Sequence, residues 1–292
     1  MRVVAREFSY FPAYVVCLTQ VTPHLRRLVL GGVGAAGWAC LGQPDEAVLL
    51  VLPERGDRLV MPDDVTEGDP HERSRWYTVR GYDSERDELA VDLAAHPVGL
   101  TSRWARSVEP GDPVGVSSPH SWWDRPADAT WQVLIGDLTA LPLISRVLEE
   151  VSEGLHTQVV VEVPEAADEQ RLMAPAGAEV RWVHTLHGQP STLESIARSM
   201  YLPPGPGYVY VAGESSATRG VRKHLRHERG LGAQRYSVAG YWRDRSEEWM
   251  QRFHAVQAQL GLEELYARFE APDADKEALN DELDRRLAAA GL

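Results

Sequence analysis

The sequence predicts a β-barrel plus α/β protein: an antiparallel barrel, then a Rossmann-like domain with a parallel sheet, then a helical C-terminal extension. Three observations carry this prediction. Short segments of alternating apolar residues, separated by Gly, Pro and Asp, fill the first part of the chain, up to about residue 120. From about residue 130, buried-type strands alternate with helices, which is typical of a parallel sheet. Residues 246–292 contain helical periodicity.

Length and composition set the outer limits. At 292 residues the chain is long enough for about two domains of roughly 100 to 200 residues each. We place the boundaries at residues 1–125, 126–245 and 246–292, the last segment being the extension. Hydrophobic residues make up 43% and charged residues 25%, as in an ordinary globular protein.

Charge and cysteine content exclude several classes. The formal net charge of -13 argues against a nucleic-acid partner, because such binding depends on clustered Lys and Arg. No apolar run approaches the roughly 20 residues that span a bilayer, and residues 1–10 lack a continuous apolar core behind basic residues, so we expect no membrane partner and a cytoplasmic location. Cys17 and Cys40 provide neither a disulfide framework nor an iron-sulfur pattern. Redox chemistry in this chain therefore needs a bound organic cofactor.

Six strands are expected in the barrel. Apolar alternation places them at residues 13–21, 25–30, 47–52, 75–81, 88–95 and 113–116. A long acidic loop at residues 53–74 is expected to be mobile. The run Gly32-Val33-Gly34-Ala35-Ala36-Gly37 matches the GxGxxG dinucleotide fingerprint, but Gly42 and Pro44 leave scarcely a turn for the helix that this fingerprint requires. We interpret the run as a connection between strands.

The α/β part follows a connector at residues 122–129. Its expected strands are residues 131–135, 156–163, 179–184, 207–211 and 235–239, and its expected helices are residues 141–151, 192–200 and 218–229. Beyond them, helical periodicity covers residues 247–260 and 275–287, with breaks at Gly261 and Pro272. These last helices could dimerise, cover an active site or pack on the preceding domain. We favour packing, because an appended amphipathic helix usually buries its apolar stripe on the nearest domain.

The run Arg75-Trp76-Tyr77-Thr78 contains the residue types of one half of a flavin site. It supplies a guanidinium for a pyrophosphate, an aromatic ring to lie on a flavin and a hydroxyl for the ring edge. Because side chains alternate across a strand, Arg75 and Tyr77 share one face and Thr78 lies on the other.

A second run, from His96 to Trp104, contains the other half. Glycine and hydroxyl residues stand there just ahead of an amphipathic stretch at residues 104–108. A helix that begins at this stretch would direct free backbone N–H groups at a phosphate.

Both runs belong to an ordered set of motifs. With them, the sequence resembles the siderophore-interacting proteins, which are FAD-containing ferric-siderophore reductases within the ferredoxin-reductase-like flavoproteins. The resemblance covers roughly residues 10–245 and rests on Arg75-x-Tyr77-Thr78, Gly99-x-x-Ser102, Pro110-Gly111-Asp112, Gly136-Asp137-Leu138-Thr139-Ala140-Leu141-Pro142, Ala212-Gly213-Glu214 and Gly240-Tyr241-Trp242-Arg243. Any one motif can arise by chance, whereas the ordered set is specific.

The resemblance implies a FAD site built from the two runs. In the first run, Arg75 would bind the FAD phosphates, Tyr77 would lie against the flavin and Thr78 would contact the isoalloxazine edge. The second run would supply the pyrophosphate contacts and a histidine near the flavin, from Gly99, Thr101, Ser102 and His96. The loop departs from the family pattern after its glycine, where Leu100 and Thr101 replace a proline and small residues.

The resemblance also implies a crevice for NAD(P)H at the carboxyl ends of two strands. Ligands of such sheets gather beyond these ends, and helix N-termini there favour phosphate. The residues concerned are Asp137, Thr139 and Ala140 after one strand and Gly213 and Glu214 after the other. Because carboxylates repel phosphates, Asp137 and Glu214 would contact ribose or nicotinamide, or shape the loops.

Two residues after the last strand complete the implied site. Trp242 would approach the flavin, and Arg243 matches a family position associated with an anionic ferric siderophore. Neither His184 with His187 nor His224 with His227 has a third ligand in pattern, so we predict no resident metal. No side chain needs to act as an acid or nucleophile, since the cofactors carry the redox chemistry.

The implied function is NAD(P)H-dependent reduction of a ferric siderophore by a FAD enzyme. Two alternatives stay open. One is a FAD enzyme recruited to a biosynthetic reaction on an organic substrate, and the other is a flavoprotein that binds a siderophore or partner without turnover. The sequence leaves open the siderophore, the choice among NADH, NADPH and ferredoxin, and the oligomeric state.

Overall fold

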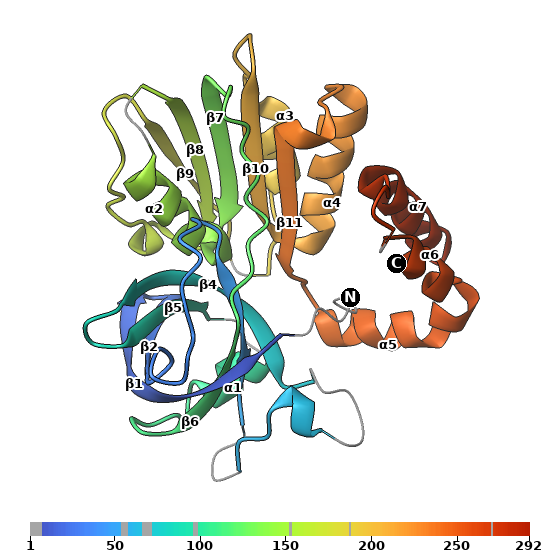
Figure 1. The fold of residues 1–292 in the computed structure, drawn as a ribbon. Helices are drawn as coiled ribbons and strands as arrows, with labels where there is room; N and C mark the ends of the chain where they lie inside the picture. Colours follow the sequence, from blue (N-terminus) through green and yellow to red (C-terminus); the bar gives the residue numbers. More distant parts are fainter. Residues whose placement is uncertain are drawn as a thin grey trace.

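The computed structural model describes residues 8–53, 58–65, 72–95, 99–151, 154–186, 188–269 and 271–292, which form a barrel, a parallel sheet and a helical extension (Figure 1). Six antiparallel strands close the barrel in the order β1-β2-β5-β4-β3-β6. They are β1 (Tyr10–Thr22), β2 (Leu25–Gly31), β3 (Ala47–Val51), β4 (Ser74–Asp83), β5 (Glu88–Ala94) and β6 (Pro113–Ser117). Alternate apolar side chains of these strands fill the interior, so the barrel predicted from apolar alternation is confirmed.

Turns, not a helix, follow β2 at the glycine-rich run. Asp87, in the β4–β5 hairpin, accepts hydrogen bonds from the N–H groups of Gly34 (2.6 Å) and Ala35 (2.9 Å). The N–H groups that a dinucleotide phosphate would need are therefore taken by a carboxylate of the barrel. The loop predicted at residues 53–74 lies partly outside the described residues, and its described part includes a 3-10 turn at Pro62–Asp64.

The second sheet consists of parallel strands in the order β11-β10-β7-β8-β9. They are β7 (Trp131–Asp137), β8 (His156–Val163), β9 (Glu179–His184), β10 (Gly207–Glu214) and β11 (Tyr236–Trp242). Helix α2 (Leu141–Glu150) packs on one face, whereas α3 (Leu193–Ser199) and α4 (Ser215–Lys223) pack on the other (Figure 1). The chain order reverses between β7 and β10, so their carboxyl ends form the switch point where such sheets bind ligands.

Short helical turns supplement these elements. A π-helical turn, His224–Glu228, continues α4, and 3-10 turns lie at Leu138–Ala140, Ala166–Asp168 and Ala233–Arg235. The order of the elements agrees with the sequence prediction, but strands β7, β10 and β11 extend past residues 135, 211 and 239, to Asp137, Glu214 and Trp242. Backbone pairing continues there through glycine and alanine, although these residues have low strand propensity. These extensions carry the predicted site residues into the sheet itself.

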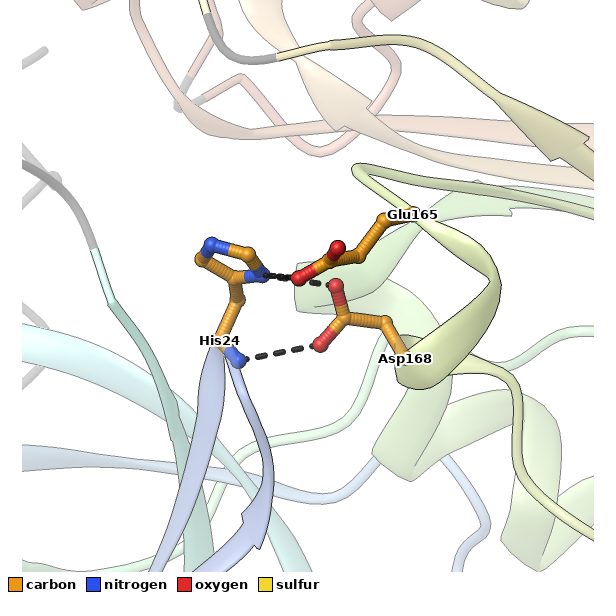
Figure 2. A group of neighbouring side chains, drawn as sticks. All are labelled: His24, Glu165 and Asp168. Atoms are coloured by element: carbon orange, nitrogen blue, oxygen red, sulfur yellow. Dashed lines mark hydrogen bonds and ion pairs between the residues drawn. The ribbon is translucent and has the colours of Figure 1, made fainter.

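A buried carboxylate joins the barrel to the parallel sheet (Figure 2). Asp168, in the 3-10 turn after β8, is fully buried and accepts hydrogen bonds from the hydroxyl of Thr22 (2.7 Å) and the backbone N–H of His24 (2.9 Å). Its other oxygen lies 2.7 Å from Nδ1 of His24. Burial favours the neutral acid, but these hydrogen bonds hold the pKa of Asp168 below its ordinary value. The carboxylate is therefore ionised at neutral pH, and both of its oxygens bind the barrel.

Helix α2 makes a second set of contacts across the same boundary. The buried Arg146 donates from Nη1 to the carbonyl oxygen of Val79 in β4 (3.0 Å). Arg80 of β4 pairs with Glu149 of α2 through both terminal guanidinium nitrogens. Leu25, the first residue of β2, lies in the apolar core of the sheet domain. Polar and apolar contacts together fix the position of one domain against the other.

The C-terminal extension contains α5 (Ser246–Val256), a 3-10 turn at Gln257–Gln259, α6 (Leu262–Phe269) and α7 (Lys276–Ala289). The sequence analysis did not predict α6. The apolar residues of these helices pack on one another in a separate small core, centred on Leu260, Leu262, Leu265, Leu279 and Leu287. Neither these helices nor the others in the described part of the chain are long and apolar enough to cross a bilayer.

Ion pairs attach this extension to the sheet domain. Arg222 of α4 is buried and lies 3.1 Å from Glu277, 2.7 Å from Asp281 and 2.7 Å from Asp284, all on α7. Tyr236 donates from its hydroxyl to Glu277 (2.5 Å). The expectation that the apolar stripes bury themselves on the preceding domain is wrong, because the apolar residues of these helices pack on one another and charged side chains make the contact with α4.

The contacts of Asp168 predict a loss of stability when its carboxylate is removed. Asp168→Ala should lower the free energy of unfolding by roughly 1.5 to 3 kcal/mol, measured by urea denaturation at pH 7, because buried donors lose a charged acceptor. Glu165→Ala is the control, since that carboxylate is 51% exposed and 3.7 Å from His24. Because the pKa of Asp168 is lowered in the folded protein, the stabilisation should be full above the ordinary pKa of an aspartate and should vanish as the pH falls through the lowered value. Equal losses in both variants would contradict this account.

Candidate functional site

The structure brings the two predicted flavin runs into contact. The hydroxyl of Tyr77 in β4 donates to Oγ1 of Thr101 in α1 (Leu100–Trp104), over 2.6 Å. Tyr77 packs against the barrel core, and burial raises its pKa to about 12, so the hydroxyl keeps its proton. Helix α1 follows β5, the neighbour of β4 in the barrel. Strand pairing therefore places these two runs side by side.

Helix α1 begins at Leu100, so the helix predicted at residues 104–108 is wrong. Trp104 and Ala105 are buried in the barrel core, which means that the apolar residues anchor the end of this helix and do not begin it. Gly99 precedes the first turn, and Thr101 and Ser102 lie inside it. The first N–H groups of a helix have no acceptor within the helix, so this turn still offers donors to a phosphate.

Arg75 lies exposed at the start of β4. Its Nη1 donates to the carbonyl oxygens of Glu72 (2.9 Å) and Ser74 (2.7 Å), both within its own segment, and it forms no ion pair with the described residues. The neighbouring Ser74 hydroxyl is buried and has no hydrogen-bond partner among the described residues. The guanidinium of Arg75 and the N–H groups of the first turn of α1 are donors whose chemistry fits the pyrophosphate of FAD.

Thr78 is expected on the opposite face of β4 from Tyr77, and in the structure it lies against the sheet domain. It is buried, and its side chain lies near enough to the hydroxyl of Tyr241 in β11 to act on the pKa of that tyrosine, lowering it against the larger effect of burial. The hydroxyl of Tyr241 also lies 3.5 Å from that of Tyr210 in β10, and burial raises the pKa of Tyr241 to about 12. The strand that carries the predicted flavin contacts therefore touches the strand that ends at Trp242.

Asp137 joins β7, the turn after it and the end of β11. Its Oδ1 accepts hydrogen bonds from the N–H (2.8 Å) and the hydroxyl (2.5 Å) of Thr139, and its Oδ2 accepts one from the indole N–H of Trp242 (2.6 Å). Burial raises the pKa of Asp137 to about 6, although each of these hydrogen bonds acts in the opposite direction. The predicted residues Asp137, Thr139 and Trp242 thus form one hydrogen-bonded group.

Two glycines allow close packing around this group. A Cβ atom on Gly136 would lie 2.5 Å from the Cβ atom of Ala140, so the small residues let the turn after β7 approach the sheet. A Cβ atom on Gly213 would collide with the carboxylate of Asp137. The predicted residues Ala140 and Gly213 therefore pack against Gly136 and Asp137 respectively, at the switch point between β7 and β10.

Glu214 holds the loop at the end of β10. It caps α4 by accepting hydrogen bonds from the N–H groups of Ser216 (2.7 Å) and Ala217 (2.9 Å), which is why α4 begins at Ser215 and not at residue 218. The hydroxyl of Ser215 donates to the carbonyl oxygen of Trp242 (2.8 Å). The carboxylates of Asp137 and Glu214 both hold backbone N–H groups of the protein.

Arg243 follows β11 beside the start of α4. Its Nη1 lies 3.3 Å from Oγ of Ser216. Burial and the nearby positive charge of Arg219 lower its pKa, whereas Glu214 acts in the opposite direction. Among the described residues, no hydrogen bond joins Arg243 to the group of Asp137, Thr139 and Trp242.

Two hydrogen-bonded groups therefore contain predicted residues, Tyr77 with Thr101 and Asp137 with Thr139 and Trp242, and the contact between Thr78 and Tyr241 links the strands that carry them. His96 lies outside the described residues. The sequence analysis missed an aromatic cluster that includes Trp76, two residues before Thr78 in β4. The ring centroids of Trp76 and Trp122 are 5.4 Å apart, and those of His120 and Trp122 are 4.3 Å apart. The available signal was the pair of adjacent tryptophans at the start of the connector.

One group of side chains has ligand atoms close enough to hold a metal ion, within the described part of the chain. His24, Glu165 and Asp168 have ligand atoms within 4.8 Å of one another (Figure 2). Both oxygens of Asp168 already bind the barrel, and Nδ1 of His24 faces one of them. Metal binding would require these contacts between domains to break, so we interpret the group as part of the domain boundary.

Comparison with known proteins matches both domains. A family model described as "Siderophore-interacting FAD-binding domain" matches residues 14–123, and one described as "Siderophore-interacting protein" matches residues 129–245. The structure resembles that of a siderophore utilization protein from T. fusca, with a TM-score of 0.70 and 32% sequence identity, over 82% of this chain and 94% of that one.

Two relatives have reductase names. The sequence is 28% identical to the NADPH-dependent ferric-chelate reductase of Escherichia coli, over 82% of this chain and 95% of that protein. It is 29% identical to the ferric vibriobactin reductase ViuB of Vibrio cholerae, over 68% of this chain and 74% of that protein.

The geometry of Arg75 predicts weaker FAD binding when its side chain is removed. Arg75→Ala should raise the dissociation constant of FAD by about one to two orders of magnitude, since a charge-assisted pair contributes roughly 1.5 to 3 kcal/mol. Fluorescence titration of the apoprotein with FAD measures this change. Arg86→Ala, whose side chain is 73% exposed in the hairpin after β4, is the control and should bind FAD like the wild type. Unchanged FAD affinity in Arg75→Ala would remove this residue from the flavin site.

The surroundings of Asp137 predict a titration that the indole of Trp242 reports. As the pH falls through about 6, protonation of the carboxyl should weaken its hydrogen bond to Trp242 and move the indole N–H resonance upfield in NMR spectra. Thr139→Val should move the midpoint to higher pH, because it removes a hydrogen bond that favours the charged form. Trp242→Phe assigns the resonance. A resonance that stays constant between about pH 5 and 7 would contradict the raised pKa.

Proposed function

Because this chain belongs to the siderophore-interacting protein family, we propose that it is a FAD-dependent oxidoreductase that reduces ferric siderophores with electrons from NAD(P)H. The match to a siderophore-interacting FAD-binding domain supports the flavin, and the names of two relatives support a ferric substrate. The site residues enter this proposal with the roles predicted for them.

The contact between Thr78 and Tyr241 carries the proposal. It joins β4, whose residues face the proposed flavin site, to β11, whose last residue binds Asp137 at the sheet edge. A nucleotide bound beyond β7 and β10 would therefore lie next to a flavin bound at β4. Two cofactors in direct contact are what electron transfer from NAD(P)H to FAD requires.

Each group of residues has a separate task in this proposal. Arg75 and the first turn of α1 bind the FAD pyrophosphate, while Tyr77 and Thr78 orient its ring. Thr139, Ala140 and Gly213 border the site of the nicotinamide nucleotide, where the two nearby carboxylates hold backbone N–H groups of the protein. Arg243 attracts the ferric substrate.

Bound FAD would accept electrons in pairs and pass them on singly, which is the chemistry that iron reduction needs. Ferric iron is the substrate, held by the hard oxygen donors of the siderophore. Reduction to ferrous iron weakens this hold, so the metal can leave the chelate. The protein binds and orients the reactants, and no side chain has to transfer a proton or form a covalent bond.

Stopped-flow measurement under anaerobic conditions tests this function. The holoprotein should be reduced by NADH or NADPH and then reoxidised by ferric chelates. Reoxidation only by an organic acceptor would favour a biosynthetic flavoenzyme, and no reoxidation by either would favour a binding protein. A failure of both nucleotides to reduce the wild type would instead favour a protein electron donor.

Substitution at the sheet edge tests the nucleotide site separately. Thr139→Trp should slow FAD reduction by NAD(P)H and leave reduction by dithionite unchanged, because it fills the space beyond β7. Thr130→Trp makes the same change at the opposite end of β7, where the hydroxyl of Thr130 contacts Pro206 (3.0 Å), and should slow neither reaction. Equal slowing of both reductions in Thr139→Trp would indicate damage at the flavin and contradict the assignment.

A further inference from the structure

The residue pair that links the C-terminal extension to the proposed site is Arg243 with Trp249. The family models end at residue 245, so Trp249 in α5 lies beyond the matched part of the chain. The Cζ atom of Arg243 stands over the ring of Trp249, 4.2 Å from its centroid. This is a cation–π contact between a predicted substrate residue and the extension, whose role the sequence left open.

We propose that Trp249 is a positioning residue for the ferric substrate: its ring holds the guanidinium of Arg243 in place and leaves its charge available to an anionic chelate. The inference rests on the proposed function, in which Arg243 binds the substrate. It assigns a task to α5 in that reaction.

The surroundings of Arg243 are unusual for an acidic protein. The chain has 43 acidic residues against 30 Lys and Arg, yet Arg243 forms no ion pair with the described residues. Its polar contact is the neutral hydroxyl of Ser216, at 3.3 Å. A carboxylate in that place would neutralise the guanidinium, whereas an aromatic ring holds it without adding an opposing charge.

Trp249 is itself held in place. Its ring stacks on Phe253, one helical turn later, with centroids 5.0 Å apart and an angle of 14° between the planes. The indole Nε1 of Trp249 is buried and has no hydrogen-bond partner among the described residues. Buried indole N–H groups normally have an acceptor, whereas the position of this ring is set by its contacts with Arg243 and Phe253 and not by a hydrogen bond of its own.

Ion pairs between α4 and α7 set the position of α5. Arg222 holds Asp281 and Asp284 of α7, and α5 shares its apolar core with α6 and α7 through Trp249 and Phe253. The start of α4 lies beside Arg243, because the hydroxyl of Ser215 binds the carbonyl oxygen of Trp242, the residue before Arg243. The extension is therefore anchored on α4, and Trp249 reaches back to the residue after β11.

Steady-state reduction of two ferric chelates tests the inference, with ferric EDTA as the anionic probe and a neutral ferric trihydroxamate as the other. Trp249→Leu should raise the KM for ferric EDTA about 2- to 30-fold and lower its dependence on salt, because the guanidinium is no longer held. The kcat for ferric EDTA and the KM for the neutral chelate should stay unchanged. Trp249→Phe keeps a ring under Arg243 and should restore most of the affinity, so it also covers the case in which the leucine variant folds poorly. Met250→Leu, at an exposed neighbour, is the control.

A double-mutant cycle separates positioning from a merely structural role. In an Arg243→Ala background, Trp249→Leu should have no further effect on the KM for ferric EDTA. A further increase in that background, an equal increase for the neutral chelate, or slower reduction of FAD by NAD(P)H would each overturn the inference. If the wild type accepts electrons from NAD(P)H but reduces neither chelate, the proposed function fails and the inference fails with it, and this outcome is visible before any variant is made.

Discussion

The buried carboxylate of Asp168 and the guanidinium of Arg146 fix the barrel against the parallel sheet, and the arrangement of the site depends on that fixed boundary. Each group binds atoms of the other domain, including backbone atoms at His24 and Val79, so a change in the angle between the domains would leave buried polar groups unpaired. Electron transfer between two bound cofactors needs such rigidity, because the rate depends on how the reacting rings face each other.

Electrostatics at the sheet edge follow from one buried acid. Burial raises the pKa of Asp137 to about 6, so the folded protein binds a proton at this carboxyl more tightly than the unfolded chain does. The contribution of Asp137 to the free energy of unfolding is therefore greatest at acid pH and is lost as the pH rises through about 6. The donors that surround it, from Thr139 and Trp242, come from the turn after β7 and the end of β11. The acid therefore organises the edge more than it stabilises the fold, which is common where a protein binds ligands.

The extension illustrates how a short segment can be held without a shared apolar core. Residues 246–292 bury only a few leucines among themselves, and segments of this size rarely fold alone. Three carboxylates around Arg222 attach them to α4. This attachment leaves α5 beside Arg243, at the point where the sheet domain ends.

The sequence by itself determined the fold class and the identity of most candidate site residues. Alternation in the first part of the chain and strand-helix succession in the second are local patterns, and they correctly predicted the barrel and the sheet. Ordered motifs singled out Arg75, Thr78, Asp137 and Arg243. Local patterns did not predict the first residues of α1 and α4, because capping and packing decide where these helices begin.

Only the tertiary structure decided what these residues touch. Asp137 and Trp242 are 105 positions apart, and Thr22 and Asp168 are 146 apart, so neither contact leaves a periodic signal in the sequence. The same holds for the extension, whose apolar stripes are visible in the sequence while their partner is not. Apolar periodicity records that a face is buried, but the covering surface is selected by the packing and charge of distant residues.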